Sequence, residues 1–320
     1  MDMFLRARAL TVLLVFALLS TGCRKYLDFE GEDLQPRLVL NGLAIADSVL
    51  TVQLTNSRGV IDPGALAAVT NGQVRVFDDQ GDLVEELVHV GEGKYRGTVT
   101  IVPGSVLAVK AEATGLGAVQ ATDRVPLAVP IQQWDTATIA TNSGGSGFDQ
   151  NSLEITLTIN DPGDRSNFYL IEGFVGQDFI IEEFFDPISG TLITDTIFFD
   201  EPVWSRAYFS TTDQVLISES DAGLGETRVY FGGAAFRDQF FNGNTRTFTV
   251  RLEGFFRSST LDLRLVSISE AAFRYYRTLE RYAYADGDPF SEPVQVFTNV
   301  QGGLGIWAGT NVEQVIIEIW

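Results

Sequence analysis

The chain has 320 residues and a formal net charge of −20, from 22 Lys and Arg residues against 42 Asp and Glu residues. This charge disfavours nucleic acid as a partner, because binding to phosphates requires a cationic surface. The chain has one cysteine, Cys23, and one histidine, His89, too few for a zinc finger or an iron–sulfur cluster. We therefore expect no cofactor. We also expect a folded globular protein, since 45% of the residues are hydrophobic and 20% charged.

Residues 1–22 have the pattern of a secretory signal peptide. Arg6 and Arg8 precede the apolar run 9–19. As a helix this run would span about 16 Å, roughly half of a ~30 Å hydrocarbon core, so it is too short to cross a membrane. It leads into a sequence that resembles a bacterial lipobox, formed by Leu19, Ser20, Thr21, Gly22 and Cys23.

The lipobox predicts cleavage before Cys23 and acylation of both its thiol and the new amino terminus. Several acyl chains, palmitate among them, anchor a protein stably, because each buried CH₂ contributes about 0.8 kcal/mol. The alternative is an ordinary signal peptide followed by an incidental cysteine. Residues 23–36 then form a lipidated tether whose acidic residues loosely resemble a surface-export signal of Bacteroidota lipoproteins. We expect an outer-membrane lipoprotein at the cell surface, with the periplasmic leaflet as the alternative location. The simpler interpretation of the acidic residues is that they only keep the tether solvated.

Residues 37–126 are predicted to form an immunoglobulin-like β-sandwich. Apolar residues recur with period two and are punctuated by Gly, Pro, Asn and Asp turns. Tyr95 is predicted to be a core aromatic, and alternation places His89 on the same face as Leu87. The expected strands are 38–43, 49–55, 73–77, 83–90, 94–101, 106–113 and 118–125.

Residues 127–150 are predicted to be a linker and mobile loop, because Pro126 and Pro130 favour an extended chain and 142–147 is rich in Gly and Ser. Residues 151–320 are predicted to form a larger antiparallel β-sandwich or barrel-like domain. The whole fold is therefore expected to be all-β with one helix in this second domain. The strands expected here are 153–159, 167–176, 179–185, 191–199, 203–209, 214–218, 228–232, 245–256, 260–269, 295–300 and 312–320.

The one expected helix spans 270–284. Ser267 and Glu270 have the spacing of a capping box at its start. Apolar residues including Phe273 and Tyr276 recur at helical spacing and are expected to pack on a sheet. The opposite face carries three arginines, Arg274, Arg277 and Arg281.

Few residues suggest chemistry. Core packing is the favoured interpretation for the tryptophans, and the alternative is that an exposed tryptophan stacks on a sugar or a peptide; the candidates are Trp134, Trp204 and Trp307. Asp286 and Asp288 are a weak Ca²⁺ candidate without EF-hand spacing. The glycines of 302–305 do not form a dinucleotide fingerprint, because no helix is predicted after them, and we expect them to permit tight turns or close sheet packing.

Several separated motifs resemble a Bacteroidota lipoprotein family catalogued as domain-of-unknown-function family 4249. The resemblance covers essentially the whole mature chain and is carried by 36–42, 167–169, 238–243, 280–294 and 299–307. It implies a surface or outer-membrane accessory found beside TonB-dependent transporters, and no catalytic residue.

From these features we expect an outer-membrane lipoprotein that acts as a non-catalytic binding accessory of a TonB-dependent nutrient uptake system, with an unknown small ligand. The alternative is a structural or adhesive cell-surface module. A carboxylate-dependent hydrolase is a third hypothesis, which requires two carboxylates roughly 5–9 Å apart in a pocket.

Overall fold

The computed structural model describes residues 35–59, 64, 66–141, 150–187, 190–217, 227–229, 234–252, 259–285 and 292–319. The expected signal peptide, Cys23 and most of the tether lie outside these residues. The contacts of the chain group Pro36–Trp320 into one compact unit. The all-β fold with one helix in the second half is confirmed for the described residues.

The first seven strands form where period-two alternation predicts them. In the second strand, for example, Leu50, Val52 and Leu54 are buried and the residues between them are exposed. Each strand end lies within two residues of the expected one. The strands are β1 (Leu38–Ile45), β2 (Val49–Asn56), β3 (Gln73–Phe77), β4 (Leu83–Gly91), β5 (Lys94–Thr100), β6 (Val106–Ala113) and β7 (Gly117–Arg124).

These seven strands enclose one hydrophobic core. β4 pairs with β5 on one side and with β3 on the other, so the sheet folds over at this strand. Strands β3, β6 and β7 contribute Val76, Val109 and Val119 to the same cluster as Leu40 and Val52 from β1 and β2. The arrangement is the predicted two-layer sandwich.

The second half of the chain contains longer strands than expected. β10 is one strand through the expected break at 177–178, where a β-bulge absorbs the irregularity. The final strand likewise begins at Leu304 and not at residue 312. The strands are β8 (Ile131–Thr141), β9 (Gln150–Asn160), β10 (Phe168–Asp186), β11 (Thr191–Arg206), β12 (Phe209–Thr211), β13 (Thr227–Val229), β14 (Ala234–Arg237), β15 (Thr245–Leu252), β16 (Ser259–Ile268) and β17 (Leu304–Ile319).

Three expectations for this half are wrong. Residues 131–141 are not a linker but strand β8, which pairs with β9 along its length. Residues 214–217 form a turn, and 295–300 have no strand structure. In both segments, side-chain packing accounts for the apolar residues, since Leu216 and Val300 are buried in separate core clusters.

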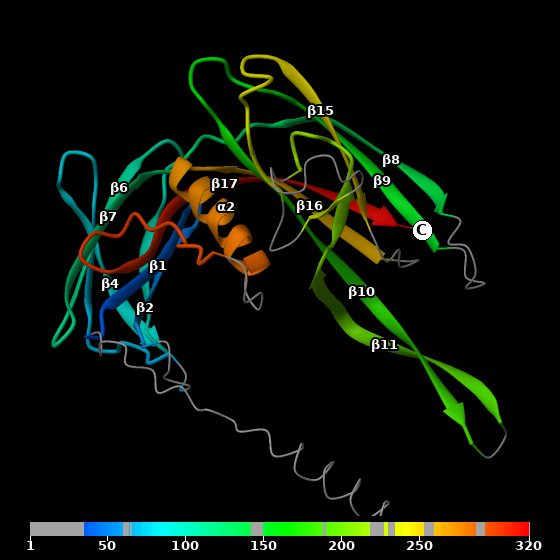
Figure 1. Ribbon diagram of the computed structural model, residues 1–320, viewed down its shortest axis with the longest axis horizontal. Helices are drawn as coiled ribbons and strands as arrows, with labels where there is room; N and C mark the ends of the chain where they lie inside the picture. The colour runs from blue at the N-terminus through cyan, green and yellow to red at the C-terminus, as the bar shows by residue number, and fades with distance from the viewer. Residues whose placement is uncertain are drawn as a thin grey trace, which may run out of the picture. The chain divides into compact units, whose positions relative to one another are not determined.

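The two halves share one sheet, because β17 pairs in parallel with β1 from Val39–Leu304 to Ile45–Thr310. Figure 1 shows the red β17 beside the blue β1. The strand order is β11-β10-β16-β17-β1-β2-β5-β4-β3-β6-β7, with β14 beside β10. The boundary expected between 126 and 151 is therefore crossed by the sheet, although each half keeps its own core cluster.

The glycines before and within β17 permit this junction. A Cβ atom at Gly303 would lie 2.3 Å from the Leu38 carbonyl oxygen, and one at Gly305 would lie 2.0 Å from that of Leu40. Gly305 also has a φ of +106°, which L side chains rarely adopt. The glycine-rich segment therefore serves close sheet packing, as predicted.

The second half has three layers. A five-stranded sheet, in the order β13-β12-β15-β9-β8, covers one face of β10, β16 and β17. Helix α2 (Glu270–Ala285) covers the opposite face. Alternation along β10 sends Tyr169 and Ile171 into the core under the five-stranded sheet, and Leu170 into the core under α2.

Helix α2 begins at a different cap from the one expected. Ser269 Oγ accepts a hydrogen bond from the Ala272 backbone N–H at 3.2 Å, which makes Ser269 the N-cap. The expected capping box at Ser267 is wrong, because Ser267 lies near the end of strand β16 and its side chain is buried there. Phe273 packs on Phe168 with ring centroids 5.0 Å apart, so the predicted apolar face does contact the sheet. In the part of the chain that the structure describes, no helix combines the length and apolarity needed to cross a membrane.

Candidate functional site

The three candidate tryptophans have different environments. Trp307 is fully buried, and its Nε1 donates a hydrogen bond to the Leu107 carbonyl oxygen at 2.9 Å. Trp307 is therefore a core residue, and the alternative of ligand contact does not apply to it. Trp134 on β8 and Trp204 on β11 are 42% and 49% exposed and can contact another molecule.

His89 and Tyr95 pack together in the N-terminal sandwich, with ring centroids 5.2 Å apart. Tyr95 is buried, donates its hydroxyl proton to the Val69 carbonyl oxygen at 2.8 Å and accepts the Gly72 N–H at 2.8 Å. The predicted core role of Tyr95 is confirmed, and His89 shares its face with the buried Leu87 as expected.

The first and last motifs of the family resemblance meet at the β1–β17 junction. Arg37 Nη2 donates to the Gly303 carbonyl oxygen at 3.0 Å. Asn299 Oδ1 accepts the Trp307 N–H at 3.1 Å, and Asn299 Nδ2 donates to the Trp307 carbonyl oxygen at 2.7 Å. The Arg37 bond therefore joins the two halves of the chain, and the Asn299 bonds brace the segment of β17 that pairs with β1.

The central motifs of the resemblance form a second hydrogen-bonded cluster. Tyr169 Oη donates to Asp161 Oδ1, and Asp161 Oδ2 accepts the Gly243 N–H at 2.9 Å. Asp238 Oδ2 accepts the Asn167 N–H at 2.6 Å. Burial raises the pKa of both Tyr169 and Asp238. Both carboxylates accept hydrogen bonds from the protein itself, so this cluster anchors the start of β10 to the turn after β14.

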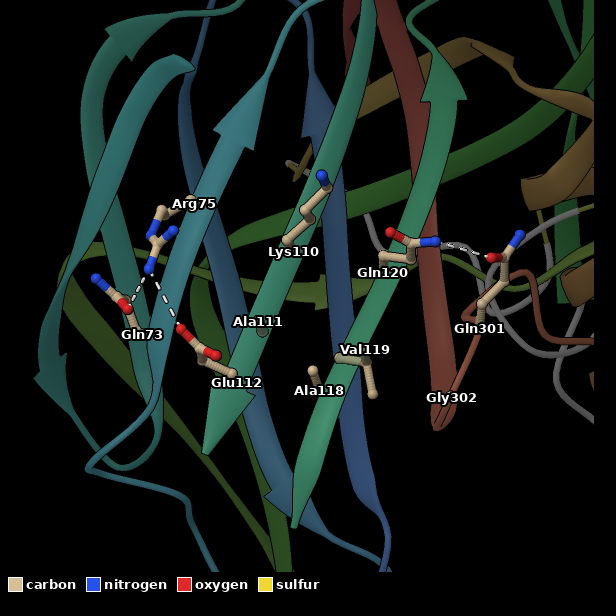
Figure 2. A pocket seen from close by; sticks show the side chains of 10 residues that line it. All are labelled: Gln73, Arg75, Lys110, Ala111, Glu112, Ala118, Val119, Gln120, Gln301 and Gly302. Atoms are coloured by element: carbon tan, nitrogen blue, oxygen red, sulfur yellow. Dashed lines mark hydrogen bonds and ion pairs between the residues drawn. The ribbon is translucent and has the colours of Figure 1, made fainter. Parts of the chain in front are cut away.

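A pocket of about 340 Å³ lies over β3, β6 and β7, and Figure 2 shows its polar side chains. Arg75 pairs with Glu112 at 3.2 Å, and Gln120 Nε2 donates to Gln301 Oε1 at 3.0 Å. The Lys110 ammonium lies 4.8 Å from the centroid of the Phe77 ring. The volume suits a small molecule. The polar side chains of this pocket largely pair with each other, so the pocket does not favour a ligand of either charge.

A second pocket, of about 400 Å³, lies at the start of α2 and contains Asp123, Asp164 and Glu270. Asp123 accepts the Gly309 N–H at 2.9 Å. Burial raises the pKa of Asp123, and the nearby Glu270 charge adds to the increase. Asp123 and Glu270 are the carboxylates that the hydrolase hypothesis would use, although Asp123 already has a structural role between β17 and α2.

The outer half of the β10–β11 hairpin carries a group of exposed apolar side chains. We call residues 178–201 the arm. β16 pairs with β10 only as far as Gln177, and within the described residues the arm's strands pair only with each other. Figure 1 shows this part of the hairpin extending beyond the strands at its base. Phe185 and Phe198 are 64% and 74% exposed on it, and Ile193 and Ile197 are also exposed.

The arm is also acidic. It has no Lys or Arg, and its seven acidic residues are Asp178, Glu182, Glu183, Asp186, Asp195, Asp200 and Glu201. Sequence analysis did not identify it, because the two strands read as ordinary sheet members; the signal available was the run of aromatics and acids without a basic residue.

The described residues contain no group of three or more His, Cys, Asp or Glu side chains placed to hold a metal ion. The weak Ca²⁺ candidates, Asp286 and Asp288, lie outside the described residues, as does Cys23 with its lipobox.

Comparison with known proteins gives one family. Residues 24–315 match the family described as Domain of unknown function (DUF4249). The chain belongs to this family. The motifs that form the β1–β17 junction and the Asp161 cluster lie within the matched DUF4249 region.

A search of curated proteins finds no match for this DUF4249 protein. Among solved structures it is similar to one described as "Fcho1 Mu homology domain (Danio Rerio) with bound Eps15 peptide". The identity is 7% over 89% of this chain and 95% of the other, and the TM-score of 0.18 carries no argument about function.

Proposed function

We propose that this DUF4249 protein is an outer-membrane lipoprotein, exposed at the cell surface, that acts as a non-catalytic binding accessory of a TonB-dependent nutrient uptake system. The anchor is the acylated Cys23. Two features support it: the signal-peptide and lipobox pattern of residues 1–23, and the start of the family match at residue 24, directly after that cysteine.

The observation that carries the binding role is the exposed, apolar and acidic arm. A two-stranded ribbon is at best marginally stable alone in water, and exposed clusters of aromatic residues mark interaction surfaces. Phe179 and Phe198 pack across the arm with ring centroids 5.6 Å apart, so its aromatic residues support one another. The surface continues to the half-exposed Trp204, which lies over Gly176 at the base of the arm.

The chemistry of the arm defines its partner as a protein surface with an apolar centre and a basic rim. Apolar side chains such as Phe198 supply the contact area, and the carboxylates steer a cationic surface and reject an anionic one. We propose that an extracellular face of the transporter supplies this surface. The alternative, an adhesive module, would use the same arm on a different partner.

The test compares the full-length wild-type protein with the double variant Phe185→Ser/Phe198→Ser. Both side chains are exposed, so the substitutions leave the cores intact. A matched control, Val88→Ser/Val102→Ser, removes two exposed apolar side chains from the N-terminal sandwich. Each protein is purified from native membranes, and the co-purified proteins are quantified by mass spectrometry.

We expect a TonB-dependent transporter with the wild type and the control, and at least a tenfold reduction with the arm variant. Equal recovery with all three proteins would show that the arm is not the contact. Recovery of no transporter with the wild type would contradict the uptake role.

A further inference from the structure

A third pocket, of about 490 Å³, lies beside helix α2. It is an open pocket lined by α2, by β14 with the turn after it, by residues 214–217 and by Phe297. The residues on which the inference depends are Arg237, Phe240, Arg274, Arg277, Arg281 and Phe297. None of them belongs to the arm or to the hydrogen-bonded clusters described above.

The charge of this pocket is opposite to that of the chain. Four of the chain's 22 basic residues line it, and none of its described lining residues is acidic. The chain as a whole has 42 acidic residues and a net charge of −20. A group of guanidinium side chains at one pocket favours an anionic ligand over a cationic one.

Contacts among the described residues hold Arg274 and Arg277 in place. The Arg274 guanidinium lies 4.1 Å from the centroid of the Phe297 ring, a cation–π contact. Phe297 is itself fixed, because its backbone N–H donates to Thr278 Oγ1 at 2.8 Å. Arg277 Nη1 donates to Glu280 Oε2 at 3.1 Å, and both side chains are partly buried. Such fixed donors lower the ordering cost of binding a ligand.

The remaining lining residues define the rest of the ligand. Phe240 is 80% exposed at the pocket, so its ring is accessible to a ligand. Phe273 and Phe297 add apolar surface, and Gln214 and Gln239 add amide groups. The volume lies within the range of small-molecule sites, about 300–1,000 Å³.

We propose that the α2 pocket binds a small anionic molecule whose phosphate or carboxylate group pairs with the arginines and whose flat apolar part packs on Phe240. Arginine is suited to this role, because its planar guanidinium binds both groups with two parallel hydrogen bonds. The pocket would give the protein a ligand of its own. It goes beyond the accessory role and does not depend on the transporter or on the arm.

The experiment titrates the purified full-length protein in detergent with phenyl phosphate, benzoate and neutral phenol, by isothermal titration calorimetry at low ionic strength. We expect saturable binding of at least one anion with a dissociation constant below about 1 mM, and at least tenfold weaker binding of phenol. Comparing phenyl phosphate with benzoate identifies which of the two anionic groups the site prefers. Added salt should weaken the anion's binding.

The variant Arg237→Gln/Arg281→Gln removes two exposed charges from the pocket and should weaken anion binding at least tenfold. The matched control Arg96→Gln/Arg165→Gln removes two exposed charges elsewhere and should bind like the wild type. Phe240→Ala tests the apolar contact and should weaken phenyl phosphate more than inorganic phosphate.

Failure of every anion to bind saturably at 10 mM or below, or equal weakening by the pocket variant and the control, would overturn the proposal. Loss of transporter recovery in the arm variant is independent of these titrations, so the two proposals can fail separately.

Discussion

Gly42 on β1 lies against the indole of Trp307 on β17, so closely that a Cβ atom at position 42 would come within 2.9 Å of Trp307 Cε3. The two residues are paired across the parallel junction that joins the halves of the chain. Because the indole is fully buried and donates a hydrogen bond to the Leu107 carbonyl oxygen, it has little room to move.

We therefore expect Gly42→Ala to reduce the free energy of unfolding by about 1–3 kcal/mol, the usual cost of overpacking a core. Urea denaturation followed by tryptophan fluorescence measures it. Gly59→Ala is the matched control, since a Cβ there meets no atom within 4 Å. Equal stability of the two variants would mean that the junction tolerates a larger residue.

The cap of α2 gives a second prediction, with a control two residues away. Ser269→Ala removes the acceptor for the Ala272 N–H and also the hydrogen bond between Ser269 and Asp123, and it should destabilise the protein by about 1 kcal/mol or more. Ser267→Ala should cost less, because its buried Oγ has no hydrogen-bond partner among the described residues. A larger loss for Ser267→Ala than for Ser269→Ala, in chemical denaturation, would place the cap where the sequence pattern suggested.

Asp123 predicts a pH dependence. Burial raises its pKa in the folded state above the ordinary value of 3.8, so the folded state favours the protonated form. That stabilising contribution is complete below about pH 3.8 and is lost as pH rises through the folded pKa. Asp123→Asn keeps an oxygen acceptor for the Gly309 N–H and carries no charge.

The stability of Asp123→Asn relative to wild type should therefore increase between pH 3.5 and pH 7. Urea midpoints at several pH values measure the difference, and two other carboxyl groups with raised pKa values, Glu172 and Asp238, are common to both proteins. A difference that stays constant, or that falls with rising pH, would contradict the assigned direction.

The sequence predicts most of the strands but not how the halves join. Alternation such as Leu50-Thr51-Val52-Gln53-Leu54 is local, and so the seven strands of the sandwich are predicted closely. Strand β8 was missed because it follows two prolines, precedes a glycine-rich segment and shows little burial contrast at the sheet edge. The pairing of β1 with β17 joins residues about 265 positions apart, and no local pattern records it.

The candidate sites show the same limit. Composition and helical spacing predict an arginine face on α2, but not that Arg237 and Phe297 would lie beside it. The tryptophan candidates could not be divided by sequence, because burial of Trp307 depends on Leu107 in another part of the chain. The arm is defined by where β16 stops pairing with β10, at Gln177, and this tertiary feature has no local sequence pattern.

The anchor is tested by Cys23→Ser. Acylation requires the thiol, so we expect wild-type cells fed a palmitate analogue to label the protein and the variant to remain unlabelled. The variant should also leave the membrane fraction, because the acyl chains supply the anchoring free energy. Persistent labelling of the variant would remove the lipoprotein assignment.

Photo-crosslinking from position 198 in living cells tests the central claim most directly. A benzophenone amino acid replaces Phe198 on the arm, and the same replacement at the exposed Val88 serves as the control. We predict an ultraviolet-dependent adduct with a TonB-dependent outer-membrane transporter from position 198 and none from position 88. Adducts only with unrelated proteins, or the same products from both positions, would contradict the account.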